Sequence, residues 1–411
     1  MQPEADVDID LEAQSVILAA AQHNTDRLRI LLRSTPVNVQ DRETGSTPLH
    51  AAIAACEPCE PEPPSVDANG HGVDDVGDFN GSRPTTDEEA AIKTVKFLLQ
   101  HGAIWNDLDH GNETPGCIAY RLGFHPLYDL MVDAGVRAEM LMNRMDEYQP
   151  IDDNDEGDDI EAGTATDAVP ATEEAFSSAH DADAALAVGV DAPGPEVDSG
   201  RYLQSHLTFQ GDRLLDADCN GVMMAWETGI MKRTAALLLP GQSLRVLNVG
   251  HGMGIVDECF QSQSPSAHHI IEAHPAVLTQ LRGNGWYDKP SVTIHEGRWQ
   301  DVLPKLLADN VMFDAIYFDT FAEDYKALRL FFSEYVLGLL DAQGGADGNG
   351  GRWSFFNGLG ADRQICYDVY SKLVEMDLFE AGFDTDWEEV AVPNLDATEE
   401  WKGPALYHLH R

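Results

Sequence analysis

Short apolar runs that end at a glycine or an acidic residue recur through the second half of this 411-residue chain. Residues 246–249, 268–272, 313–319 and 352–356 are rich in Val, Ile, Leu, Phe and Tyr, which is typical of buried strands. An amphipathic helix is predicted over 364–383, and antiparallel strands are predicted over 386–393 and 405–411. This half, residues 200–411, is therefore predicted to be an α/β domain with a Rossmann-like parallel sheet.

The first 148 residues show helical spacing of apolar positions instead. The run GSTPLHAAI, from Gly45 to Ile53, is close to the first-helix signature of ankyrin repeats, in which Thr-Pro begins the helix. Thr47 and Thr114 lie 67 residues apart, which is about twice the ankyrin period of roughly 33. Residues 57–88 are rich in Pro, Gly and Asp and are predicted to be a disordered insertion. We predict ankyrin-like helical repeats over 1–148, which either dock protein partners or only shield the second domain.

The net charge of −45 is not evenly spread, and its density is highest between these two domains. Residues 151–200 carry 15 acidic and no basic side chains, so an acidic flexible linker is predicted over 149–199. Binding to nucleic acid is disfavoured, because a phosphate backbone requires basic side chains. The acidity favours a basic, arginine-rich protein partner, or it only keeps the protein in solution.

Other classes of protein are disfavoured by composition. No apolar run approaches the roughly 20 residues of a membrane helix, and the acidic N-terminus does not resemble a signal peptide. The six cysteines are scattered, which is typical of a reducing compartment. Cys56 and Cys59 form a CxxC pair without a second pair, so no metal site is predicted.

The most informative segment is RVLNVGHGMGIVD, a predicted strand that turns into a helix through Gly250, Gly252 and Gly254. Glycines let the backbone pass close to a ligand, and a helix N-terminus suits a nucleotide-like group. Glu272 ends the next strand, 22 residues after Gly250, where a carboxylate can accept hydrogen bonds from both ribose hydroxyls. The GxGxG spacing differs from the GxGxxG of dinucleotide folds, although an NAD-binding domain stays an alternative.

These segments, together with NGVMMAWETGIM, EGRWQDV and YFDTF, resemble the S-adenosylmethionine-dependent guanidinoacetate methyltransferases. With the ankyrin-like half, the chain is similar to the fungal type IV protein arginine N5-methyltransferases. The resemblance implies methyl transfer to the delta nitrogen of arginine in a protein, for which a ribosomal protein is a candidate. It also implies a monomer found in cytoplasm and nucleus.

The resemblance implies a cofactor site for S-adenosylmethionine. Two positions depart from the family pattern: Asn248 stands where many methyltransferases have an acid, and His251 stands where the guanidinoacetate enzymes have an aromatic residue. Met223 and Met231 match two family methionines, but both could instead fill the core from one helix face. The implied cofactor residues are Tyr202, Met223, Met231, Gly250, His251, Gly252, Met253, Gly254, Ile255, Val256, Glu272, Ala273, His274, Arg298, Trp299 and Asp319.

The chemistry of arginine requires carboxylates. A guanidinium is planar and protonated at neutral pH, so an enzyme must orient it and accept a proton as the methyl group arrives. Asp319, at the end of its strand, and Glu227, in AWETGIM, are the predicted catalytic residues. In the resembled family the matching Asp and Glu grip the guanidino group, and the Asp is the base. Two other functions stay open: a small-molecule guanidino methyltransferase, and an ankyrin scaffold without activity.

Overall fold

The computed structural model describes residues 4–56, 86–147, 199–346, 348, 350–361, 363–391 and 406–410. Contacts group the described residues up to Glu139 and from Ser199 onward into one compact unit, and residues 140–147 belong to a second. Most of the predicted insertion 57–88 lies outside the described residues, and its last three residues belong to a helix that begins at Thr86. The predicted linker 149–199 also lies outside them, apart from Ser199. No helix among the described residues has the length and apolarity to cross a membrane.

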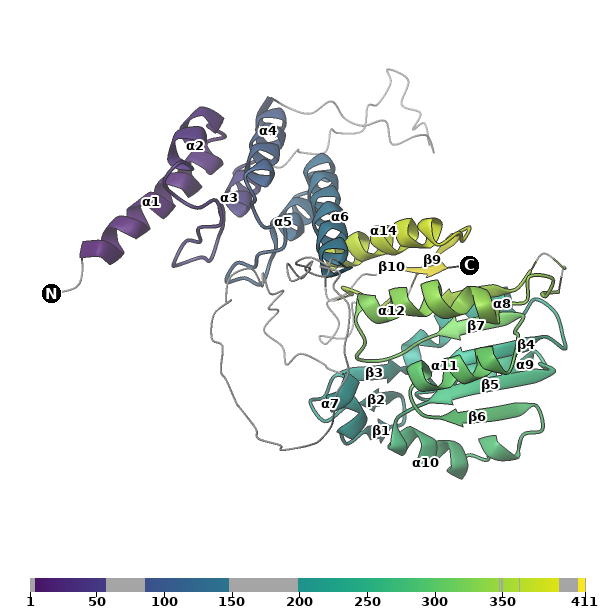
Figure 1. Ribbon diagram of the computed structural model, residues 1–411. Coiled ribbons are helices and arrows are strands. Elements are labelled where there is room, and N and C mark those ends of the chain that lie inside the picture. Colours follow the sequence, from purple (N-terminus) through teal and green to yellow (C-terminus); the bar gives the residue numbers. More distant parts are fainter. Residues whose placement is uncertain are drawn as a thin grey trace, which may run out of the picture. The chain divides into compact units, whose positions relative to one another are not determined.

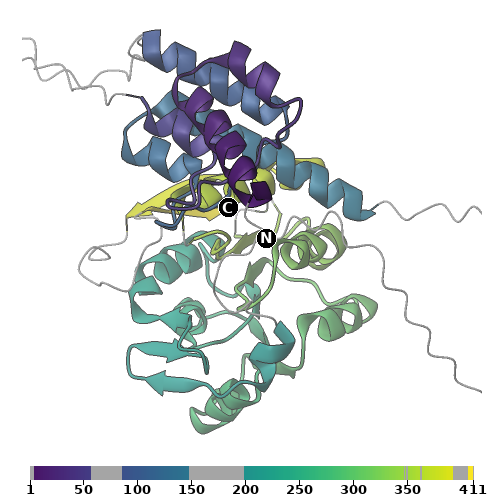
Figure 2. The same cartoon turned by 90° about the vertical axis from the view of Figure 1, so that its left-hand side faces the viewer.

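The N-terminal residues form a stack of helices (Figures 1 and 2). Helix α1 packs against α3, α3 against α5, and α2 against α4. Thr47 and Thr114 are N-caps, and a proline follows each of them as the first helical residue. This helical stack fits the predicted repeat pattern, and its assignment to the ankyrin family stays a prediction. The helices are α1 (Glu4–Ala21), α2 (Thr25–Leu31), α3 (Pro48–Ala54), α4 (Thr86–Gln100), α5 (Pro115–Arg121) and α6 (His125–Glu147).

The second half contains a five-stranded parallel sheet in the order β6-β5-β4-β7-β8. The predicted Rossmann-like parallel fold is therefore confirmed (Figure 1). The sheet has one strand more than the sequence predicted, because β6 is a half-exposed edge strand with a weak apolar pattern. The strands are β4 (Arg245–Val249), β5 (Ala267–Glu272), β6 (Val292–Glu296), β7 (Ala315–Phe318) and β8 (Arg352–Phe355).

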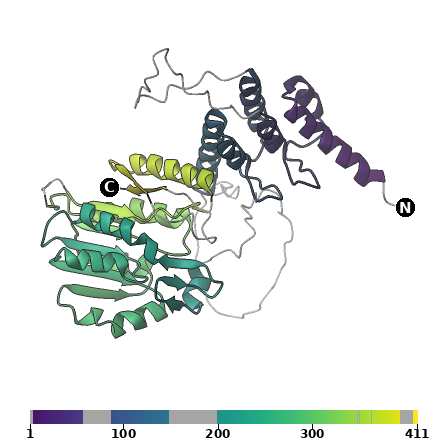
Figure 3. The ribbon, with the colours of Figure 1, turned by 180° about the vertical axis from the view of Figure 1, so that it is seen from behind.

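Helices cover both faces of this sheet, as the view from behind also shows (Figure 3). Alternate strand residues such as Val246 and Tyr317 pack with α8 (Thr228–Leu238), α9 (Ile255–Ser262) and α10 (Pro275–Gly283). On the other face, Trp299 packs edge-on against Phe318 and Phe331. These rings join the sheet to α11 (Trp299–Ala308) and α12 (Tyr325–Phe331). The carboxyl ends of the strands therefore lie at an edge between the two helix-covered faces of the sheet.

Smaller elements complete the domain. Helix α7 (Ser199–Gln204) precedes a small antiparallel sheet of β1 (Thr208–Gln210), β2 (Arg213–Leu215) and β3 (Gly221–Met224). The short turn η1 (Ala225–Glu227) leads from β3 into α8, and the helical residues 332–339 after α12 form η3 (Phe332–Val336) and α13 (Leu337–Leu339). Near β8, β9 (Trp387–Ala391) and β10 (Leu406–His410) pair antiparallel, as predicted.

Helix α14 (Gln364–Glu380) is buried on more than one side, as its alternating buried residues show. The hydroxyl of Tyr128 in α6 donates to Asp368 at 2.5 Å. A Cβ atom added to Gly116 of α5 would lie 1.8 Å from the Ile365 side chain, and one added to Gly135 of α6 would lie 2.6 Å from Val369. The absence of side chains at these two glycines lets α5 and α6 approach α14 closely.

Candidate active site

The site lies at the carboxyl edge of the sheet, where the chain crosses from one side of β4 to the other. Gly250 follows β4 and Asp319 follows the neighbouring β7. The Asp319 N–H donates to the Val249 carbonyl at 2.9 Å, and Gly250 has a φ of +96°. A Cβ atom at position 250 would lie 1.9 Å from the Asp319 carbonyl oxygen. Glycine is therefore required where the two strand ends meet, and open α/β sheets bind ligands at such a point.

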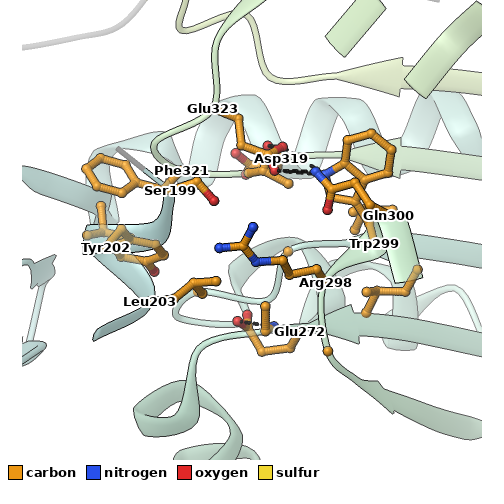
Figure 4. Close-up of a pocket in the computed structure, with 18 of the residues that line it drawn as sticks. Ser199, Tyr202, Leu203, Glu272, Arg298, Trp299, Gln300, Asp319, Phe321 and Glu323 are labelled. Atoms are coloured by element: carbon orange, nitrogen blue, oxygen red, sulfur yellow. Dashed lines mark hydrogen bonds between the residues drawn. The ribbon is translucent and has the colours of Figure 1, made fainter. Parts of the chain in front are cut away.

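A first cavity opens at this edge, and we call it the cofactor cavity (Figure 4). Nine of the predicted cofactor residues line it: Tyr202, Met223, Gly250, Gly252, Glu272, Ala273, Arg298, Trp299 and Asp319. Ten further residues line it that the sequence did not predict: Ser199, Leu203, Val222, Val249, Ile271, Gly297, Gln300, Thr320, Phe321 and Glu323. The glycine turn and both acidic strand ends, which the sequence predicts to form one site, therefore line the same cavity.

Glu272 is a buried carboxylate held by backbone donors. Its Oε1 accepts from the N–H groups of Ala273 at 2.8 Å and His274 at 2.7 Å, and its Oε2 accepts from the His251 N–H at 3.0 Å. These bonds join the end of β5 to the glycine turn and fix the carboxylate before any ligand arrives. Oε2, which accepts one of these bonds, keeps acceptor capacity for a hydroxyl such as those of ribose.

We expect Glu272→Ala to weaken binding of S-adenosylmethionine by about 1.5–3 kcal/mol, or roughly 10- to 150-fold, because hydrogen bonds to a charged acceptor are lost. Isothermal titration calorimetry measures the change. Glu258→Ala removes an exposed carboxylate from α9 and serves as the control. Equal affinity in the two variants would exclude Glu272 as the ribose acceptor.

Seven of the predicted cofactor residues do not line the cofactor cavity, and their roles stay predictions. His251 points away into a buried network, where its Nδ1 lies 2.6 Å from Asp257. The same carboxylate accepts from Asn248 at 2.8 Å and pairs with His268 at 2.9 Å. Burial raises the pKa of Asp257, but the two histidines outweigh burial and lower that pKa to about 2. An acid from α9, Asp257, thus lies beside Asn248, although it does not line the cofactor cavity.

The two methionines lie in different elements, so they do not share one helix face, but both are buried in the same hydrophobic core, as the alternative expected. Met223 is in β3, and its sulfur accepts from the Met253 N–H at 3.2 Å beside Gly252. Met231 is in α8, fully buried, with the Tyr317 hydroxyl 3.5 Å from its sulfur.

The remaining predicted residues lie at the N-termini of α9 and α10, next to the cofactor cavity rather than in its lining. Gly254 is the N-cap of α9, Ile255 and Val256 begin that helix, and Val256 is fully buried. His274 caps α10, and its Nε2 lies 3.2 Å from the Tyr202 carbonyl.

A second, larger cavity of about 790 Å³ adjoins the first, and we call it the acceptor cavity. Val222, Asp319, Thr320, Phe321 and Glu323 line both cavities. Four carboxylates and one guanidinium are among its charged lining residues, so the cavity favours a cation. These are Glu227, Asp319, Glu323, Asp324 and Arg213.

The two predicted catalytic carboxylates both line the acceptor cavity and are deeply set. Burial, and secondarily the charge of Asp257, raises the pKa of Asp319 to about 7. Burial and the charge of Asp319 raise the pKa of Glu227 well above its usual value. Among the described residues, the Oδ2 of Asp319 has no hydrogen-bond partner, whereas Glu227 accepts from the Met224 N–H at 3.2 Å. An unpartnered buried carboxylate at the junction of the two cavities is suited to receive a proton or a cation.

Glu323 is a site residue that sequence reasoning missed. It lies in the run FAEDYK with another acid beside it, and nothing in that run distinguishes it from a surface carboxylate. Only the fold brings it over Trp299, where both of its oxygens accept from the indole N–H at 3.0 and 2.8 Å.

Comparison with known proteins agrees with this geometry. The family model described as guanidinoacetate N-methyltransferase matches residues 203–358. A protein of Emericella nidulans named protein arginine N-methyltransferase 2 is 56% identical over 416 residues, covering 98% of this chain and 95% of that protein. The proteins of the same name from Aspergillus oryzae and Neurospora crassa are 55% and 41% identical, and they cover 98% and 95% of this chain and 94% and 91% of their own lengths.

Proposed function

The chain belongs to the protein arginine N-methyltransferase 2 family, and we propose that it transfers one methyl group to the delta nitrogen of arginine in a basic protein. The enzyme is an arginine methyltransferase that uses S-adenosylmethionine. The observation that carries the proposal is the pair Asp319 and Glu227 in the acceptor cavity, with Asp319 also lining the cofactor cavity.

The residues of the cofactor cavity suit the methyl donor. S-adenosylmethionine, when bound, supplies a methyl group from a positively charged sulfonium. Glu272 is held by backbone donors where it could accept from the ribose hydroxyls, and Arg298 and Trp299, at the start of α11, would flank the adenine. The Met223 sulfur beside Gly252 offers a polarisable contact for a sulfonium ligand.

The acceptor side explains how a poor nucleophile becomes reactive. Two carboxylates can accept from the N–H groups of both terminal nitrogens, so that the guanidinium lies side-on and its delta nitrogen faces the cofactor cavity. Asp319 then takes the proton from the reacting nitrogen on its Oδ2, which has no other partner among the described residues. Glu227 holds the plane and keeps the remaining positive charge paired. Positioning for in-line displacement supplies much of the acceleration.

A protein substrate is favoured by the size and charge of the site. The acceptor cavity of about 790 Å³ is larger than a small guanidino acid requires. A strongly acidic chain attracts a basic partner, and ribosomal proteins have that charge. The ankyrin-like helical stack offers a second surface for docking such a partner. A small-molecule guanidino acceptor is the second candidate, supported by the family model over 203–358.

Product analysis tests the proposal. The full chain is incubated with methyl-labelled S-adenosylmethionine and a ribosomal protein fraction, and with guanidinoacetate in a parallel reaction. Mass fragmentation of the labelled arginine is expected to show the methyl group on the delta nitrogen. Label on a terminal nitrogen would overturn the proposed position, and label in guanidinoacetate alone would favour the second candidate.

Glu227→Gln is expected to lower turnover by about 10- to 100-fold, less than loss of the base, because the amide keeps the shape but pairs poorly with the cation. Steady-state kinetics with the same protein fraction measures it. Glu258→Gln is the matched control on an exposed face. Full activity of Glu227→Gln would remove this residue from the proposed mechanism.

A further inference from the structure

One short loop, Thr320–Asp324, forms the wall between the two cavities. It follows Asp319 directly and leads into α12. Phe321 and Glu323 line both cavities, as does Thr320, whereas Ala322 and Asp324 line only the acceptor cavity. The conformation of this wall loop therefore decides the shape of the acceptor cavity.

Glu323 ties the wall loop to the cofactor side. Its two oxygens accept from the Trp299 Nε1 at 3.0 and 2.8 Å, and its Oε1 also accepts from the Gln300 Nε2 at 3.0 Å. The Thr320 hydroxyl donates to its Oε2 at 2.9 Å. Both oxygens are thus engaged by the protein, which separates Glu323 from the carboxylates that are open to a guanidinium. Trp299 and Gln300 are the first residues of α11, next to Arg298, and both line the cofactor cavity.

The wall loop needs such an anchor because its backbone is strained. Ala322 has a φ of +62°, a left-handed conformation that costs a residue with a Cβ about 1–2 kcal/mol. Conformations of this kind persist where the surroundings fix them. Downstream, Asp324 caps α12 through the Ala327 N–H at 2.9 Å, and the Tyr325 hydroxyl donates to Asp377 of α14. These contacts fix the far end of the loop, and Glu323 fixes the end next to the cofactor.

We propose that Glu323 is a positioning residue that couples occupancy of the cofactor cavity to the shape of the acceptor cavity. A cofactor packed beside Arg298 and Trp299 restrains the indole, and the indole N–H holds Glu323. Glu323 then holds the wall loop in the conformation that completes the acceptor cavity. Because such coupling is reciprocal, acceptor also binds more tightly to the cofactor-loaded enzyme. The proposal depends on the cofactor cavity but not on which arginine nitrogen is methylated.

Hydrogen exchange of the full chain, with and without S-adenosylhomocysteine, tests the coupling without any acceptor. In the wild type, the ligand is expected to slow exchange of peptides covering 322–328 by roughly 5- to 150-fold, the usual range of coupling between sites. In Glu323→Gln, the side-chain NH₂ group cannot accept hydrogen bonds from the N–H groups of Trp299 and Gln300. The ligand-dependent slowing of exchange at 322–328 should therefore fall below about twofold. Peptides covering the glycine turn, 249–256, should stay protected in both.

Asp324→Asn is the matched control, because it removes a neighbouring carboxylate from the same cavity while asparagine still caps α12. It should keep the ligand-dependent slowing at 322–328. If Glu323→Gln fails to fold, Trp299→Phe removes the donor and keeps an aromatic ring, and it should give the same loss. The proposal is overturned if the wild type shows no slowing at 322–328, or if the variant that folds keeps it. Failure of the delta-nitrogen proposal would appear only in the product analysis, so the two failures are distinct.

Discussion

Replacing Asp319 with asparagine is expected to lower turnover by about two to four orders of magnitude, the scale of losing a general base. The amide keeps the shape of the side chain but cannot accept the proton that arginine must release. Affinity for S-adenosylmethionine should change far less, because the predicted ribose acceptor is Glu272 rather than Asp319. Steady-state kinetics and calorimetry separate the two effects. A fully active Asp319→Asn would mean that the base is elsewhere in the acceptor cavity.

The pH dependence follows from the same carboxylate. Burial raises the pKa of Asp319 to about 7, so kcat/KM of the wild type should fall as the pH drops below 7 and this proposed base becomes protonated.

The stability of the protein without ligand should show the opposite sign. Because the folded pKa lies above the unfolded value near 3.9, the ionised carboxylate costs stability above pH 7. Asp319→Asn should therefore melt at a higher temperature than the wild type at pH 8, and this gain should vanish as the pH falls towards about 4. Asp309→Asn, at an exposed carboxylate after α11, is the control and should show no such gain. Equal melting temperatures of Asp319→Asn and wild type at pH 8 would contradict the burial argument.

Replacing Gly250 with alanine is expected to abolish cofactor binding and to destabilise the fold by roughly 3 kcal/mol or more. The new Cβ would lie 1.9 Å from the backbone oxygen of Asp319, and backbone at the junction of two buried strands cannot move aside cheaply. The positive φ of +96° adds strain that only glycine avoids. Chemical denaturation and calorimetry measure the two losses.

Gly283→Ala is the matched control for that change. Gly283 lies in α10, where an added Cβ meets nothing within 4 Å, so alanine should be neutral or slightly stabilising. If Gly250→Ala folded and bound the cofactor as well as Gly283→Ala does, the close approach of the two strand ends would not govern the site.

The sequence predicted those parts of the fold that have continuous apolar runs. Strands β4, β5, β7 and β8 are buried along most of their length and contain short apolar runs such as the AIYF of β7, so their patterns are visible in the sequence. Strand β6 is half exposed at the sheet edge, and β1–β3 are three or four residues long, so their patterns carry little signal. Glu272 and Asp319 were found because an acid that ends a buried strand is conspicuous.

The direction of a side chain is harder to predict than its position in the chain. His251 lies in the glycine turn, yet its ring leaves the cofactor cavity because Asp257 in α9 attracts it. Met231 matches the family pattern but lies in the core, since α8 presents that face to Tyr317. Glu323 was missed because its role depends on Trp299, which is 24 positions away and meets it only in the folded chain.

The contacts of α14 bear on how this architecture can change in evolution or be engineered. Ile365 and Val369 of α14 fill space that exists because Gly116 and Gly135 lack side chains. Tyr128 and Asp368 add a polar link between the same helices. The helical stack therefore cannot be exchanged freely for another. A different repeat array fused to this catalytic domain would need glycines at the matching positions, or α14 would have to be redesigned with it. Substitutions on the two sides of this contact should consequently arise in pairs.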